Sequence, residues 1–203
     1  MDKKYAEFVG VDSLHYAKIT EDNETNYTAD TPTYLAPTAE ISSEVEIENT
    51  PTYYDNVAAF NYVSEGTTTL TVTVSGVPAK TAADLLGKDY DETNGLVLDD
   101  GVPNPPDVAL SFRFNKGSDG FRYYQYLKGT FSGGAEEATS KSGSVDVKTY
   151  ELTYTAVVTT HKFPVGGKQK GLKRIFADTD DTNFKAATAA AWFDKVQVPG
   201  AGE

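Results

Sequence analysis

The side chains that most often carry catalysis or hold metals are few and scattered in this sequence. It has no cysteine, which excludes disulfides and thiolate chemistry, and two histidines, His15 and His161. Neither has another histidine nearby, so a structural or surface role is favoured over metal binding or catalysis. Residues 178–183 and 89–94 resemble calcium loops, but each has Asn where such a loop needs glycine at its sixth position. We interpret both as solvated loops or helix caps.

The motifs of common enzyme classes are also missing from the sequence. There is no G-x-S-x-G nucleophile motif, and Val165-Gly166-Gly167-Lys168 lacks the spacing and following helix of a phosphate-binding loop. Any acidic chain offers carboxylate pairs for glycoside hydrolysis, and nothing singles out one pair here. The sequence therefore predicts a protein that is not an enzyme, with no catalytic residue and no metal site.

A regular row of acidic and hydroxyl side chains is the most informative pattern in the chain. Every second residue of one segment belongs to it: Glu40, Ser42, Glu44, Glu46 and Glu48. The residues between them are mostly apolar: Ile41, Ser43, Val45 and Ile47. Successive side chains of a β-strand point to opposite faces. The segment is therefore predicted to be a strand with carboxylates on one face and a core-facing row on the other.

The overall charge limits the partners that the chain can have. With 18 Lys and Arg against 30 Asp and Glu, the formal net charge is −12. Binding nucleic acid by neutralising phosphates needs clustered Lys and Arg, so this mode is excluded. An acidic surface serves solubility, or lines a passage through which nucleic acid slides without being held. No stretch approaches the roughly 20 apolar residues that span a bilayer, and residues 1–10 do not resemble a secretory signal, so we expect a cytosolic place of assembly.

The spacing of apolar residues predicts a mainly β fold. The clearest strand covers residues 67–77, where Leu70, Val72 and Val74 alternate with hydroxyl side chains. Several further strands of similar length follow along the chain. Alternating βαβ units, which would indicate a parallel sheet, are missing from the sequence.

Two short helices are expected beside these strands. The first has Thr81 as its predicted N-cap and Gly87 as its terminator. The second covers residues 183–193, where the apolar spacing is amphipathic. We find no internal repeat and no domain boundary. The sequence thus predicts one domain, residues 1–203: an antiparallel β-sandwich or barrel with one or two short flanking α-helices.

Three polar segments are predicted to be irregular. Residues 21–37 contain two prolines and are expected to form a flexible loop or arm. Residues 49–56 are expected to bend around Pro51, which we expect to end the acidic strand. Residues 132–144 are rich in Gly, Ser, Ala and Glu and are expected to form a flexible loop.

Four segments, taken in order, resemble the major tail proteins (tail tube proteins) of long-tailed siphophages, in particular the phi13-type group. They are the opening Phe8-Val9-Gly10-Val11-Asp12-Ser13-Leu14-His15-Tyr16-Ala17, the Thr-rich strand that leads to Ala82-Ala83-Asp84-Leu85-Leu86-Gly87, the Tyr-rich Gly120-Phe121-Arg122-Tyr123-Tyr124-Gln125-Tyr126, and the Thr-rich strand from Tyr150 to Thr160. The resemblance covers nearly the whole chain and rests on the order of these pieces and the total length.

The resemblance implies a structural protein of the bacteriophage virion, with a tail-tube-protein-like β fold and no enzymatic activity or cofactor. Subunits would form hexameric rings that stack into a hollow tail tube, with inner strands of neighbours joined around the lumen and with loops bridging the rings. Genome DNA would pass through transiently and without specific contacts during ejection. Further partners would be the tape-measure protein and the tail terminator, with no membrane contact. The protein would be assembled in the host cytoplasm.

On this interpretation two sets of residues become candidates for function. The candidates for lining the lumen are Glu40, Glu44, Glu46 and Glu48; an outer solvated face remains the alternative. The candidates for contacts between subunits or rings come from the three irregular segments, for each of which a plain surface loop remains the alternative: Asn26, Tyr27, Tyr53, Tyr54, Gly133, Gly134, Glu136 and Glu137.

Other functions remain open at this point. A carbohydrate-binding or adhesin-like β-sandwich module could use the Tyr-rich residues 121–126 as stacking rings. Adjacent Tyr123 and Tyr124, however, point to opposite faces of a strand, which favours one buried ring and one interface ring. A tail terminator or head–tail connector would form one ring and no polymer. A hydrolase is the remaining alternative.

Overall fold

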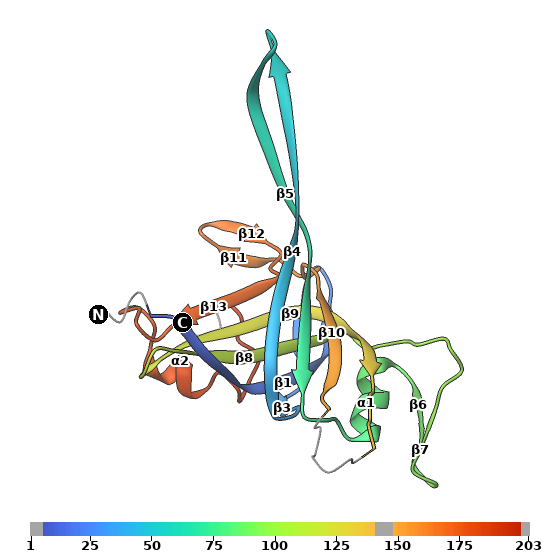
Figure 1. The fold of residues 1–203 in the computed structure, drawn as a ribbon. Coiled ribbons are helices and arrows are strands. Elements are labelled where there is room, and N and C mark those ends of the chain that lie inside the picture. The colour runs from blue at the N-terminus through green and yellow to red at the C-terminus, as the bar shows by residue number, and fades with distance from the viewer. Residues whose placement is uncertain (1–5, 141–147, 200–203) are drawn as a thin grey trace.

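A computed structural model describes residues 6–140 and 148–199 of the chain (Figure 1). Within these ranges the strands and helices follow one another as β1 (Phe8–Asp22), β2 (Tyr27–Ala29), β3 (Thr33–Tyr34), β4 (Thr38–Tyr54), β5 (Val57–Val74), α1 (Ala79–Leu86), β6 (Asp89–Asp91), β7 (Leu96–Leu98), β8 (Val108–Lys116), β9 (Gly120–Ala135), β10 (Tyr150–Ala156), β11 (Phe163–Val165), β12 (Lys168–Lys170), β13 (Arg174–Asp178) and α2 (Ala186–Ala190). The predicted mainly β fold with two short helices is confirmed.

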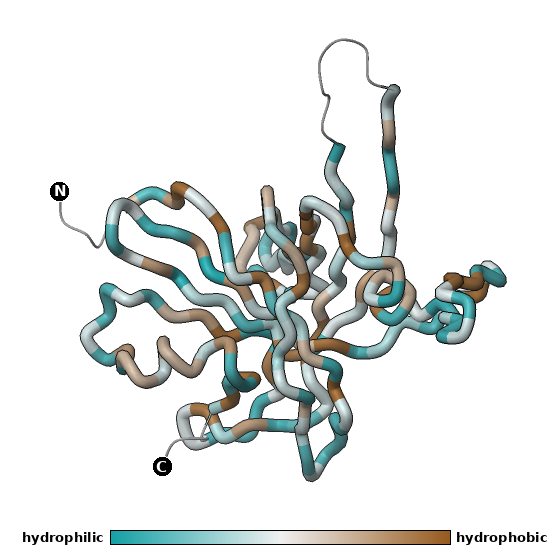
Figure 2. Tube along the Cα trace, turned by 90° about the horizontal axis from the view of Figure 1, so that it is seen from below, coloured by the Kyte–Doolittle hydropathy of each residue, from teal (hydrophilic) through white to brown (hydrophobic). Residues whose placement is uncertain are grey.

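One large antiparallel sheet forms the body of the protein. Across the described residues its strands lie in the order β2-β1-β8-β9-β10-β5-β4, and β13 joins at β9 and β3 at β1. The sheet curves so that β1 and β4, which lie near its two ends, come into contact. This curvature makes the body sandwich-like, and Figure 2 shows hydrophobic segments meeting in its middle.

The core lies against one face of the sheet. Leu70, Val72 and Val74 of β5 are completely buried, as their alternation with threonines predicts. The neighbouring strands β9 and β10 add Phe131 and Tyr154 to the same cluster. The Tyr154 hydroxyl donates a hydrogen bond of 2.8 Å to the Val108 carbonyl, so the buried polar group is satisfied.

The two helices differ from their predicted ends. Helix α1 ends at Gly87, which has the predicted left-handed conformation (φ 67°), but its N-cap is Pro78 and not Thr81. Proline's fixed φ and missing N–H suit a helix start, so the helix begins earlier than the Thr81 pattern indicates. Helix α2 covers residues 186–190 and is shorter than predicted. The chain leaves it so that the Trp192 ring lies 5.3 Å from the ring of Tyr123.

The segment at residues 21–37 is not the free arm that the sequence suggests. It forms β2 and β3, which pair with β1. Leu35 and Ala36 of this segment are buried in the core, which holds the segment against the body. Pro32 and Pro37 flank a two-residue strand instead of preventing one.

The segment at residues 132–144 is also more regular than predicted. Residues 132–135 extend β9, and Gly133 pairs with Leu152 of β10. Both Gly133 and Gly134 have positive φ angles, 91° and 82°, which glycine adopts without strain. The rest of the segment includes Glu136 and Glu137, and residues 141–144 lie outside the described ranges.

The largest departure from the sequence prediction is the length of the β4–β5 hairpin. Strand β4 runs through Pro51, and the predicted bend at residues 49–56 is the end of a hairpin that projects far from the body (Figure 1). Asp55 and Asn56 form its two-residue turn with φ angles of 50° and 65°, the left-handed pair that a type I′ turn requires. Proline is tolerated here because β4 is an edge strand.

Candidate assembly surfaces

The outer face of the sheet carries a continuous field of hydroxyl and carboxylate side chains, which we call the polar face. On β4, Glu40, Ser42 and Glu44 pair with Thr73, Thr71 and Thr69 of β5. The same threonines pair on their other side with Glu151, Thr153 and Thr155 of β10, and Thr153 and Thr155 pair with Ser132 and Thr130 of β9. Paired residues share a face, so these side chains form one surface opposite the core.

The polar face is acidic and has no positive charge among its members. Its carboxylates are Glu40, Glu44 and Glu151, and all three are exposed. Glu40 and Glu44 are four residues apart on one strand, about 13 Å, so salt at physiological strength largely screens their repulsion. One copy of the chain therefore maintains this charge at little cost in folding free energy. Hydroxyls and carboxylates give a nucleic acid backbone no cationic group to bind.

Of the four predicted lumen residues, Glu40 and Glu44 lie on the polar face and the other two lie beyond it. Glu46 and Glu48 belong to the projecting part of the hairpin. There a bulge opposes Glu46 to two residues of β5, and its carboxylate accepts hydrogen bonds of 3.3 Å and 3.2 Å from the N–H and hydroxyl of Thr67. All residues of the predicted row therefore belong to one strand, but only its first part covers the body, and the rest of the row projects away from it.

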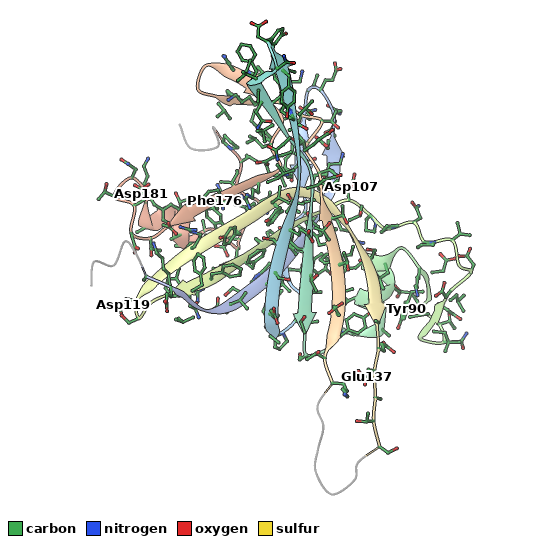
Figure 3. All side chains as sticks on the ribbon, turned by 45° about the horizontal axis from the view of Figure 1, so that its top comes forward. Tyr90, Asp107, Asp119, Glu137, Phe176 and Asp181 are labelled. Atoms are coloured by element: carbon green, nitrogen blue, oxygen red, sulfur yellow. The ribbon has the colours of Figure 1, made fainter. Side chains whose placement is uncertain are left out.

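The projecting part of the hairpin, residues 46–66, is here called the distal hairpin. Its large apolar side chains are exposed, as Tyr53 at 65% and Phe60 at 61% illustrate, and the side chains stand out on both sides of the ribbon (Figure 3). The predicted core-facing row of β4 is therefore confirmed only in part. Ile41 is buried and Val45 is half-buried, but Ile47 is exposed because the strand has left the body there. Ser43 is exposed although it pairs with the buried Leu70 of the body.

The register assigns these apolar side chains to two faces. Tyr54, Val57, Phe60 and Tyr62 share the face of Glu48, and the Tyr54 and Phe60 rings meet edge to face at 6.1 Å. The other face carries a second apolar set: Ile47, Tyr53, Ala58 and Val63. Water thus surrounds a two-stranded ribbon that is apolar on both faces, an arrangement that is marginally stable by itself.

The outer edge of β4 is also unpaired. Strand β4 is 17 residues long and lies at the end of the sheet, where β5 alone, among the described strands, is hydrogen-bonded to it. Such an edge presents a row of free backbone donors and acceptors, which is a template for strand addition by another chain. The distal hairpin leaves apolar side chains uncovered, and the edge of β4 leaves backbone groups without hydrogen-bond partners within the described ranges. Together they form a surface suited to binding another chain.

Ion pairs connect the strands of the body from which the distal hairpin projects. The buried Asp22 carboxylate accepts hydrogen bonds from Lys128 (2.7 Å) and from the N–H groups of Thr160 (2.9 Å) and His161 (2.8 Å). Burial opposes its ionisation, but these donors outweigh burial and lower the pKa of Asp22. Similarly, hydrogen bonds from Arg122 lower the pKa of Asp178 and fix β13 to β9.

The predicted inter-subunit residues are found in different environments. Tyr53 and Tyr54 are at the tip of the distal hairpin, fully available to a neighbour. Tyr27 is not, because its hydroxyl donates to the Leu127 carbonyl at 2.5 Å and its ring lies against Phe163. Asn26 is exposed in the turn before β2.

In the predicted loop the side chains of Glu136 and Glu137 are exposed, and Glu137 pairs with Lys148 at 3.2 Å. Gly133 and Gly134 belong to β9, and a side chain at Gly134 would collide with Tyr150 and Leu86. These two glycines therefore have a local structural role in the folded chain.

Sequence reasoning missed Val57, Phe60, Tyr62 and Val63 as interface candidates. The Asp-Asn pair between two alternating segments is the hairpin signal that would have found them.

In the part of the chain that the structure describes, no three His, Cys, Asp or Glu side chains converge as metal ligands, and no helix is long and apolar enough to cross a membrane. No protein-family model matches the chain, and no curated protein matches it.

Proposed function

We propose that this chain is the tail tube subunit of a long-tailed bacteriophage and polymerises as stacked hexameric rings. The observation that carries the proposal is the distal hairpin, which is apolar on both faces and bare in a single copy. A ribbon of this kind becomes stable when further strands or a packed surface cover it. A chain that must meet another copy to complete itself is suited to a polymer.

The polar face supports the second half of the proposal, the conduction of DNA. It carries exposed glutamates and half-buried threonines, and none of its members is a lysine or arginine. Duplex DNA has one negative charge per roughly 1.7 Å of its axis, so a wall of this kind repels it at short range and offers no site that holds it. Placed toward the lumen, Glu40 and Glu44 would let the genome pass at ejection.

The remaining parts of the proposal rest on the resemblance of the chain to phage tail tube proteins. They are the hexameric ring, the tape-measure protein and tail terminator as partners, and the virion as location. Assembly would take place in the host cytoplasm.

Electron microscopy of the concentrated protein in negative stain tests the class. We expect tubes of constant width. Single rings of one size would instead indicate a terminator or connector, and monomers at every concentration would contradict the proposal. A control variant replaces residues 48–64 with Asn-Gly, which closes a short hairpin after Ile47 and leaves the body intact. It should fold and remain monomeric.

The double variant Glu40→Lys/Glu44→Lys tests the lumen. Phage particles that carry it should form tails of normal width but release DNA more slowly, because each new ammonium binds phosphate. The matched control is Asp100→Lys/Asp194→Lys, which reverses two exposed charges outside the polar face and outside the predicted inter-subunit residues. Normal release from the first variant would move the lumen to another face.

A sugar-binding function is the competing proposal, since exposed tyrosines stack on sugar rings. Tyr54, Phe60 and Tyr62 do share one face of the ribbon, but the Tyr54 and Phe60 rings meet edge to face and so do not form the flat platform on which a sugar ring stacks. Binding on a glycan array that Tyr53→Ser and Tyr54→Ser abolish would favour this alternative.

A further inference from the structure

The charges of the distal hairpin all have one sign. Residues 46–66 contain Glu46, Glu48, Asp55 and Glu65 and no lysine or arginine. Glu46 is bound to Thr67, but Glu48 and Asp55 have no ion-pair partner among the described residues. A surface that will cover the distal hairpin should therefore supply cations along with apolar contact.

A second hairpin on the same chain has the opposite charge. Strands β11 and β12 with their flanks, residues 162–173, are here called the basic hairpin. They contain Lys162, Lys168, Lys170 and Lys173 and no acidic residue. Lys168 and Lys170 share one face of the hairpin, are exposed, and have no ion-pair partner in the described part of the chain.

The two hairpins already meet once within a single copy. The Lys173 ammonium donates to the Gly66 carbonyl at 3.0 Å and lies 3.7 Å from the Glu65 carboxylate, at the foot of the distal hairpin. Figure 1 shows β11 and β12 beside this foot, with the rest of the distal hairpin extending beyond them. Glu48 and Asp55 of the distal hairpin and Lys168 and Lys170 of the basic hairpin take no part in this contact, so they are available to a second copy.

We infer that the basic hairpin is the docking surface for the distal hairpin of a second copy. Lys168 and Lys170 would pair with Glu48 and Asp55, and their ammonium groups suit the faces of the exposed tyrosine rings as well. Donor and acceptor are different surfaces of one chain, so the contact is head-to-tail, the type that closes into rings or continues as a filament. The inference rests on the proposed polymer and deepens it by naming the two surfaces that meet.

Charge reversal followed by charge restoration tests the pairing. Lys168→Glu/Lys170→Glu should raise the critical concentration for assembly about tenfold at low salt, and less at high salt. Adding Glu48→Lys/Asp55→Lys to the same chain should restore assembly. If the first variant assembles like the wild type, or the second pair of changes restores nothing, the assignment of these surfaces is wrong while the tube proposal stands.

Zero-length cross-linking detects the contact between the two hairpins even if no tubes form. A carbodiimide joins an ammonium to a carboxylate only where they touch. In a concentrated mixture of isotopically labelled and unlabelled chains, mass spectrometry should find Lys168 or Lys170 joined to Glu48 or Asp55 of a differently labelled chain. This product without tubes would support the contact and contradict the tube. Its absence would overturn the contact whether or not tubes form.

Discussion

Replacing Phe60 with threonine tests whether the distal hairpin drives association. Phe60 is 61% exposed in the single copy. An aromatic side chain buries roughly 200 Å² when fully covered, so a neighbour can remove about 120 Å² more from water. At about 25 cal/mol per Å² this area contributes about 3 kcal/mol, or about half of that if only one side is covered.

We therefore expect Phe60→Thr to raise the critical concentration for assembly by about 10- to 100-fold. Threonine keeps the strand preference of the position, so the hairpin should persist. Within the single copy the variant loses only the edge-to-face contact with Tyr54, about 0.5–1 kcal/mol, and the body should keep its urea midpoint.

Sedimentation of the assembled fraction across a concentration series measures the critical concentration. The control is Phe176→Thr, which removes a half-exposed aromatic residue from β13, a strand of the body. An unchanged critical concentration for Phe60→Thr would refute the reasoning, as would an equal rise for the control.

Three further predictions concern the body that supports the distal hairpin. Asp22→Asn should lower the free energy of unfolding by about 2–3 kcal/mol in urea titrations, because Lys128 loses its nearest carboxylate. Since the folded pKa of Asp22 is lowered, its contribution is complete above the unfolded pKa near 4 and is lost as pH falls through the folded value; a variant with the same acid sensitivity as wild type would contradict this. Tyr154→Phe should cost about 1–2 kcal/mol by the same titration, because the buried Val108 carbonyl loses its donor; no loss would show that this bond contributes nothing. Gly87→Ala should lower the thermal midpoint by several degrees, because its φ is left-handed and a Cβ would collide with the backbone of residues 104–105; an unchanged midpoint would contradict the strain.

Much of the fold could be predicted from the sequence because the relevant signals are local. The alternation of Leu70, Val72 and Val74 identifies a strand and its buried face, since one sheet covers that face along the whole segment. Gly87 ends its helix because few other residues adopt the left-handed conformation. These signals depend on neighbours only a few residues away.

The candidate site was predicted only in part, because burial depends on distant segments. The alternation of residues 40–48 identifies a strand, and Ile41 is buried as expected, but Ile47 has the same spacing and is exposed. Pro51 indicates a strand end when read locally, yet the position is at a sheet edge, where a missing N–H is tolerated.

By itself the sequence determined that this chain is a mainly β, strongly acidic protein with one alternating row of carboxylates. Only the tertiary structure decided which part of that row covers the body and which part projects from it. It also brought Asp22 to Lys128 and the basic hairpin to the foot of the distal hairpin, across about a hundred residues of chain. The physical reason is that periodicity fixes the direction of a side chain relative to its own strand, whereas burial and ion pairing depend on which other segments the fold brings against that strand.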